Sequence, residues 1–135
     1  MKLVQIFLCI ALLGGTLAGA AQTKPGDLWV EVPFAFFVAG QELPAGQYVV
    51  TPQGDACIRI FNSQKRGIYV LTHRSRRIAS EESKLVFHRY GDTYFLSGVW
   101  LTGNTSGREL FPSRAERELA NRKAEMELAV VRPAQ

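Results

Sequence analysis

The sequence predicts a mainly β protein, built as a small antiparallel β barrel or sandwich of about six to eight strands with one C-terminal α-helix. Two observations lead to this class. Between residues 28 and 111, short runs rich in β-branched and aromatic residues are separated at close intervals by proline, glycine and aspartate turns. After Pro112 the chain becomes charged and contains no glycine or proline until Pro133, a pattern typical of a helix.

The first strands are expected over residues 29–38, where Pro33 indicates an edge strand or two short strands that meet at the proline. Residues 43–46 then form a turn, because Pro44 has a restricted φ and Gly46 tolerates the last turn position. Further strands are expected at residues 47–51, 57–61 and 68–72. The polar and charged residues 74–83 are expected to form a long surface loop.

The most specific hairpin signal is Gly91-Asp92, which separates the alternating runs 84–90 and 93–101. Gly98 in the second run indicates a bulge, or a bend beneath a neighbouring aromatic side chain. Residues 103–107 are expected to be a flexible connection to the rest of the chain.

One helix is expected over residues 112–131. Ser113 and Glu116 have the spacing of a capping box, in which the serine caps the first turn. The apolar positions of the segment make a narrow stripe of Ala115, Leu119, Met126 and Val130. A helix with so narrow a stripe is expected to lie across the sheet, to project into solvent, or to contact a partner helix.

Residues 1–21 have the pattern of a secretory signal peptide: Lys2, an apolar run over residues 3–13, and small residues at 18–21. The run is shorter than the roughly 20 residues that cross a bilayer. We therefore expect cleavage near Ala20 or Ala21 and a periplasmic or extracellular protein without a transmembrane segment. Residues 22–27 would follow as a flexible lead-in and residues 28–111 as the β domain. An uncleaved N-terminal anchor is the alternative.

The cysteines and histidines argue against catalytic chemistry. Cys9 would leave with the signal, so Cys57 would have no partner for an internal disulfide. No metal-binding spacing, cofactor motif or nucleophile motif is present, so neither a metal, a cofactor nor an enzyme is expected. A small hydrolase or isomerase that uses His88 with a carboxylate is the least favoured function; His73 is the other histidine.

Basic residues outnumber acidic ones between residues 65 and 89, within a chain of net charge +4. Arginine matches the geometry of phosphate and carboxylate groups. One hypothesis is therefore an anion-binding module for an acidic glycan, a lipid head group or another polyanion, whose site consists of Arg74, Arg76, Arg77 and Arg89. Tyr69, Phe87 and Tyr90 are interleaved with these and could stack against a ligand. The alternative is a solvated surface, and nucleic acid is not the expected partner.

Several motifs lie along the chain: V-P-F-A-F at 32–36, L-P-A-G-Q-Y at 43–48, K-L-V-F-H-R-Y-G-D at 84–92, G-R-E-L at 107–110 and S-R-A-E-R-E-L at 113–119. In these motifs the chain resembles a family of small exported proteins of soil bacteria. The resemblance spans nearly all of the chain after the leader. It implies export and carries no activity to this chain.

The favoured function is an exported, non-enzymatic β domain that acts as a binding or envelope-associated interaction module. Its partner would be an unknown protein or envelope component. We expect the partner-binding element to be the C-terminal helix, through Leu119, Met126 and Val130.

Production of the full chain in a bacterial host that has a periplasm tests the leader. We expect the intact mass of the exported protein to be that of a chain that begins at Ala21 or Gln22, because signal peptidase requires small residues before its cleavage point. A variant with Ala20 and Ala21 both replaced by leucine should keep the leader. A wild-type mass that still includes residues 1–21 would contradict the assignment.

Overall fold

The computed structural model describes residues 26–64, 66–78, 82–102, 106–122 and 125–133, so the predicted signal peptide and most of the lead-in fall outside the described residues. The described part contains a 10-stranded sheet and one helix. The prediction of a mainly β protein with a C-terminal helix is confirmed. The strands are more numerous than predicted. Among the described residues, no helix is long and apolar enough to cross a bilayer.

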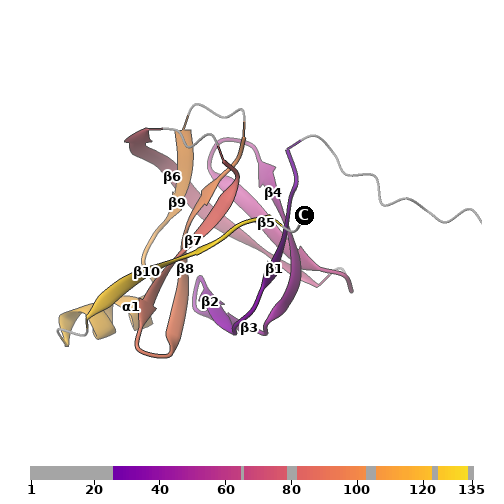
Figure 1. Ribbon diagram of the computed structural model, residues 1–135. Coiled ribbons are helices and arrows are strands. Elements are labelled where there is room, and N and C mark those ends of the chain that lie inside the picture. Colours follow the sequence, from indigo (N-terminus) through magenta and orange to yellow (C-terminus); the bar gives the residue numbers. More distant parts are fainter. Residues whose placement is uncertain (1–25, 65, 79–81, 103–105, 123–124, 134–135) are drawn as a thin grey trace, which may run out of the picture.

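The elements follow one another along the chain as shown in Figure 1. They are β1 (Leu28–Val32), β2 (Phe36–Val38), β3 (Gln41–Leu43), β4 (Gly46–Gln53), β5 (Cys57–Asn62), β6 (Gly67–Ile78), β7 (Lys84–Tyr90), β8 (Thr93–Trp100), β9 (Ser106–Leu110), α1 (Arg114–Asn121) and β10 (Met126–Val131).

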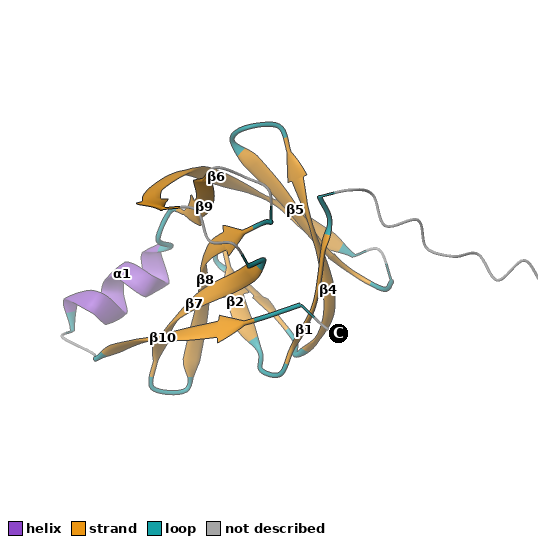
Figure 2. Ribbon diagram, turned by 45° about the horizontal axis from the view of Figure 1, so that its top comes forward, coloured by secondary structure: helices purple, strands orange, loops and turns teal. Residues whose placement is uncertain are grey.

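The sheet curls on itself without closing. Its main path runs β1-β4-β5-β6-β9-β8-β7-β10, and every pairing along it is antiparallel. β8 also pairs in parallel with β2, which pairs with β3. In the described part of the chain, the two ends of the path are joined by an isolated backbone bridge between Val30 of β1 and Pro133, and no ladder of strand pairs closes the sheet. Figure 2 shows the strands wrapped around a common interior, with α1 outside the curl.

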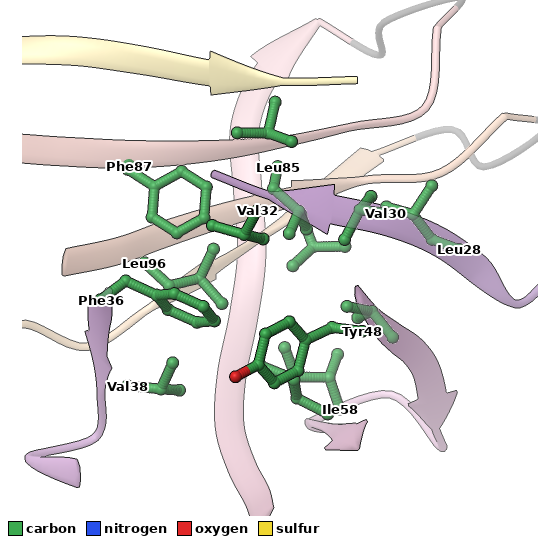
Figure 3. Packing of buried hydrophobic residues seen from close by; sticks show 14 of the residues in the cluster. Leu28, Val30, Val32, Phe36, Val38, Tyr48, Ile58, Leu85, Phe87 and Leu96 are labelled. Carbon is green, nitrogen blue, oxygen red and sulfur yellow. The ribbon is translucent and has the colours of Figure 1, made fainter. Parts of the chain in front are cut away.

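The inner face of the curled sheet holds the hydrophobic core. In β1 the buried Leu28, Val30 and Val32 alternate with exposed residues, as expected for a strand with one face inward. Phe36 and Phe87 are among the largest fully buried side chains, and their rings meet edge to face with centroids 5.4 Å apart. Figure 3 shows these rings surrounded by aliphatic side chains from several strands. Each such side chain stabilises the fold by about 1.5–3 kcal/mol through burial.

The expected bulge near Gly98 is confirmed. Val86 pairs with Gly98, but the next residue of β7, Phe87, pairs with Leu96, so Ser97 is an extra residue in β8. A bulge of this kind bends the strand and increases its twist. The sheet can therefore curve sharply at β8.

Trp100 occupies the space that two glycines leave open. A Cβ atom at Gly98 or at Gly107 would overlap the indole ring of Trp100, and the indole is almost fully buried. Because the bulge shifts the alternation of β8, Leu96 and Val99 both reach the inner core, although they are an odd number of residues apart. Trp100 therefore packs against the backbone of β8 and β9 close to the bulge that changes which residues of β8 face the core.

The turn predictions are confirmed where the structure describes them. Tyr90 pairs with Thr93 across the Gly91 hairpin, and Gly91 has a φ of 61°, which favours glycine. The run that contains Pro33 divides into β1 and β2, which confirms the alternative of two short strands over that of one edge strand.

The prediction that residues 112–131 form one helix is wrong. The N-cap is correct, because the backbone N–H of Glu116 donates to the Ser113 hydroxyl at 3.2 Å. However, α1 ends at Asn121, and β10 follows it as a strand antiparallel to β7. Ala129 and Val131 of this strand pack at the core, whereas Met126, Leu128 and Val130 are exposed on the other face. The free edge of β7 supplies the backbone partners that the strand needs. Long-range pairing thus overrides the local helical preference of this segment.

The expected long loop over residues 74–83 is wrong in its first half, because β6 continues to Ile78. β9 provides the partner strand, from Thr72 opposite Leu110 to Ile78 opposite Ser106, with a shift of register in between. The charged residues of this segment favoured the prediction of a loop. A strand tolerates charged residues once its backbone is paired, as that of β6 is with β9.

Substitution of Gly98 tests the packing of Trp100. We expect Gly98→Ala to lower the free energy of unfolding by about 1–3 kcal/mol, because the added methyl group must displace the indole ring. Denaturant unfolding measures the change. In the Trp100→Leu background the same substitution should cost much less, and equal costs in both backgrounds would contradict the contact.

Candidate functional site

A pocket with a volume of about 210 Å³ lies on the outer face of the sheet, beside α1. Five strands and the start of the helix contribute to its wall. The apolar part consists of Val86, Trp100, Leu110, Pro112 and Leu128. The polar part consists of His73, His88, Ser97, Glu109 and Glu116. An apolar wall with a few polar groups is the usual composition of a ligand-binding pocket.

A buried carboxylate joins the helix to the sheet at this pocket. Glu116 Oε1 lies 2.5 Å from Nδ1 of His88. Glu116 is 5% exposed and is the only buried residue of α1, so the carboxylate has exchanged water for protein partners. The contact positions His88 because its Nδ1–H donates to the carboxylate, which leaves Nε2 as a hydrogen-bond acceptor or base when the ring is neutral.

Tyr90 provides a second, longer contact to the same carboxylate. Its hydroxyl donates to Glu116 Oε1 at 3.4 Å. The pKa of Tyr90 is raised, first because burial disfavours the phenolate, and then because the charge of Glu116 and the hydrogen bond to it stabilise the neutral hydroxyl. Since the folded-state pKa is the higher one, the stability that this group contributes is complete below pH 10.0, the ordinary pKa of tyrosine. It is lost as the pH rises through the folded-state value.

The other polar groups of the pocket are held by neighbours too. Glu109 Oε1 accepts a hydrogen bond from the hydroxyl of Ser75 at 2.8 Å. The Ser97 hydroxyl donates to the carbonyl oxygen of Val86 at 3.1 Å. The ring of His73 lies 4.8 Å from that of Phe111, at the side of the pocket toward β6. These contacts fix the shape of the wall and leave Ser97 tied to the backbone.

The two histidines therefore meet at one pocket, which the sequence did not indicate. The carboxylate that the hydrolase hypothesis requires is present as Glu116. No group of three His, Cys, Asp or Glu residues with the geometry to hold a metal ion occurs in the ranges that the structure describes.

The structure separates the arginines of the proposed anion site. Arg74 is exposed on β6 and pairs in register with Arg108 of β9. Arg89 lies on β7, three strands along the path, or about 14 Å away by strand spacing alone. The backbone of Arg76 and Arg77 belongs to β6, and their side chains fall outside the described part. Anion binding by these arginines stays a prediction.

Arg89 has acidic surroundings. It lies 3.8 Å from a carboxylate oxygen of Glu127 and shares a shallow hollow with Gly91, Glu125 and Glu127. Its Nε donates to the carbonyl oxygen of Gly91 at 2.7 Å. Two carboxylates beside one guanidinium offset the charge that an anionic ligand would need.

The proposed partner-binding stripe is divided between two elements. Leu119 lies on α1, whereas Met126 and Val130 are exposed on β10. The prediction that these residues form one stripe on a helix was wrong, because Met126 and Val130 belong to a strand. Phe87, which was expected to stack against a ligand, is fully buried in the core.

The contacts of two further residues, Glu116 and Arg59, were not predicted from the sequence. Glu116 was assigned to the capping box, yet its side chain contacts His88, 28 residues away. No local pattern could indicate that contact. Arg59 was not considered as a binding residue, although a charged residue flanked by Ile58 and Ile60 on a strand indicates an outward-facing cation.

Comparison of this chain with protein-family models, with curated proteins and with solved structures finds no match. The resemblance to exported proteins of soil bacteria therefore stays a prediction. Any functional conclusion depends on the geometry of the site itself.

Replacement of Glu116 by glutamine tests the contact with Tyr90. We expect Glu116→Gln to lower the pKa of Tyr90 part of the way toward its ordinary value, because the charge is removed while burial remains. Titration followed by NMR of tyrosine labelled at Cζ measures this change. The pKa of Tyr48, which burial alone raises, should stay the same in both proteins. An unchanged Tyr90 titration would contradict the contact.

Proposed function

We propose that this protein is an exported, non-catalytic binding module whose ligand occupies the pocket beside α1. The observation that carries the proposal is the pocket itself, about 210 Å³ in volume, with an apolar wall and a small set of polar groups. Such a volume accepts a small molecule or one side chain of a partner protein.

The hydrogen bonds of the pocket support binding rather than turnover. Glu116 is engaged by His88 and Tyr90, Glu109 by Ser75, and the hydroxyl of Ser97 by a backbone oxygen. Groups held in this way form a rigid wall with defined polarity, which lowers the ordering cost of binding. The export part of the proposal is supported by the signal pattern of residues 1–21.

A second candidate is a small hydrolase or isomerase in which His88, oriented by Glu116, transfers a proton. The 2.5 Å contact between them favours it, because a carboxylate that holds one ring nitrogen of histidine leaves the other free for acid and base chemistry. We rank this candidate below ligand binding because the hydroxyl of Ser97, which lines the pocket, already donates to the backbone carbonyl oxygen of Val86. Hydrolysis of a chromogenic ester that disappears in His88→Gln would decide for this candidate.

Ligand binding is tested by titrating the ¹⁵N-labelled protein with a library of small carboxylate, amine and imidazole compounds. We expect the amide shifts caused by binders to cluster at the residues that line the pocket. Leu128→Trp should abolish these shifts, because the larger side chain fills the pocket mouth, where Leu128 is 55% exposed.

Met126→Trp is the matched control, since Met126 is exposed on the same face of β10 but does not line the pocket. It should leave the shifts unchanged. Shifts that cluster elsewhere, or that persist in Leu128→Trp, would refute the pocket as the binding site.

A further inference from the structure

A group of outward-facing side chains on β5, β6 and the residue after β9, three of them exposed and two half-buried, forms a second surface, which adjoins the pocket at Phe111. This aromatic platform consists of Arg59, Phe61, Tyr69, Leu71 and Phe111. Tyr69, Leu71 and Phe111 are 67%, 68% and 61% exposed, the highest values among the large hydrophobic residues of the described part. Large side chains exposed together on a sheet indicate a binding surface.

The register of the strands makes the platform continuous. Arg59 lies directly opposite Tyr69, and the next outward pair along the strands is Cys57 and Leu71. Phe111 follows Leu110, whose partner on β6 is Thr72. The ring of Phe111 also contacts that of His73, which lies on the same face of β6 as Leu71. The platform therefore extends across β5, β6 and the residue that follows β9.

Arg59 holds a positive charge at the platform in a fixed orientation. Its guanidinium carbon lies 4.3 Å from the centre of the Phe61 ring and 5.9 Å from that of Tyr69. Within the described ranges, the ion pairs of the protein do not include Arg59. Stacking on the rings orients the guanidinium while leaving its N–H groups available for the two oxygens of a carboxylate.

We propose that the aromatic platform binds the uronic acid units of an acidic polysaccharide. Arg59 pairs with the sugar carboxylate, and the rings of Tyr69 and Phe111 pack against the apolar faces of sugar rings. The exposed aromatic faces supply sequence-tolerant stacking, as they do for the rings of other polymers. This proposal is independent of the pocket beside α1.

The charge of the platform favours a sugar over other anionic partners. A lipid surface is recognised by clusters of about four to eight basic residues, and nucleic acid by several phosphate contacts at once. Among the residues that the structure describes, the platform carries one cation, Arg59, with Arg66 in the turn at the end of the same hairpin. One guanidinium beside exposed rings matches a ligand that combines a single carboxylate with a flat apolar face.

Titration calorimetry with oligogalacturonic acid tests the proposal, with the methyl-esterified oligomer of the same length as the uncharged control. We expect the wild-type protein to bind the acid and to bind the ester at least about tenfold more weakly. Arg59→Gln should weaken binding of the acid about tenfold or more, and Arg59→Lys by less, because lysine keeps the charge but not the fork. Tyr69→Ala should weaken it by a factor of about 5 to 100.

Arg117→Gln is the control for net charge, since Arg117 is exposed on α1 and belongs to none of the elements that form the platform. It should bind as the wild type does, and thermal unfolding should confirm that all variants are folded.

Absence of binding, equal binding of acid and ester, or equal loss in Arg59→Gln and Arg117→Gln would overturn the proposal. Tighter binding to phosphatidylglycerol vesicles would overturn it in favour of a lipid, and self-association removed by Tyr69→Ala in favour of a second copy. None of these results depends on the pocket, which Leu128→Trp tests separately.

Discussion

The packing of Trp100 against two glycines is the constraint on which the rest of the structure depends. The indole lies where side chains at Gly98 and Gly107 would otherwise be, so it joins β8 to β9 at the point where β8 bulges against β7. The bulge changes which residues of β8 point inward and allows the sheet to curl around its core. The same indole forms part of the pocket wall on the outside. One side chain thus connects the curvature of the sheet with the shape of the site.

The helix depends on a different kind of contact. An eight-residue helix has little stability alone, and the only residue that α1 buries is an acid. Its attachment to the sheet therefore rests on the contacts of Glu116 with His88 and Tyr90 more than on hydrophobic burial. A buried carboxylate is costly unless its partners are in place, so this attachment is specific in geometry.

Much of the fold could be predicted because strands and turns leave local signals. Alternation and turn residues located the β1 to β5 region, the Gly91 hairpin and the bulge at Gly98. β10 was missed because its methionine, glutamate, leucine and alanine also suit a helix, and only the distant edge of β7 makes it a strand. The pocket was missed for the same reason. Its central contact joins residues 28 positions apart, and neither His88 nor Glu116 has a neighbour in sequence that indicates the other.

The bridge between Val30 and Pro133 has a consequence for how the chain folds. It brings the first described strand to the residues that follow the last one, and Val131 belongs to the same core cluster as Leu28. These contacts span almost the whole described chain, so their loop-closure entropy is among the largest in the molecule. A chain that lacks residues 126–133 leaves one side of its apolar interior open to water. The fold can therefore be completed only once these residues are available, and their pairing with the first strand belongs to the late steps of folding.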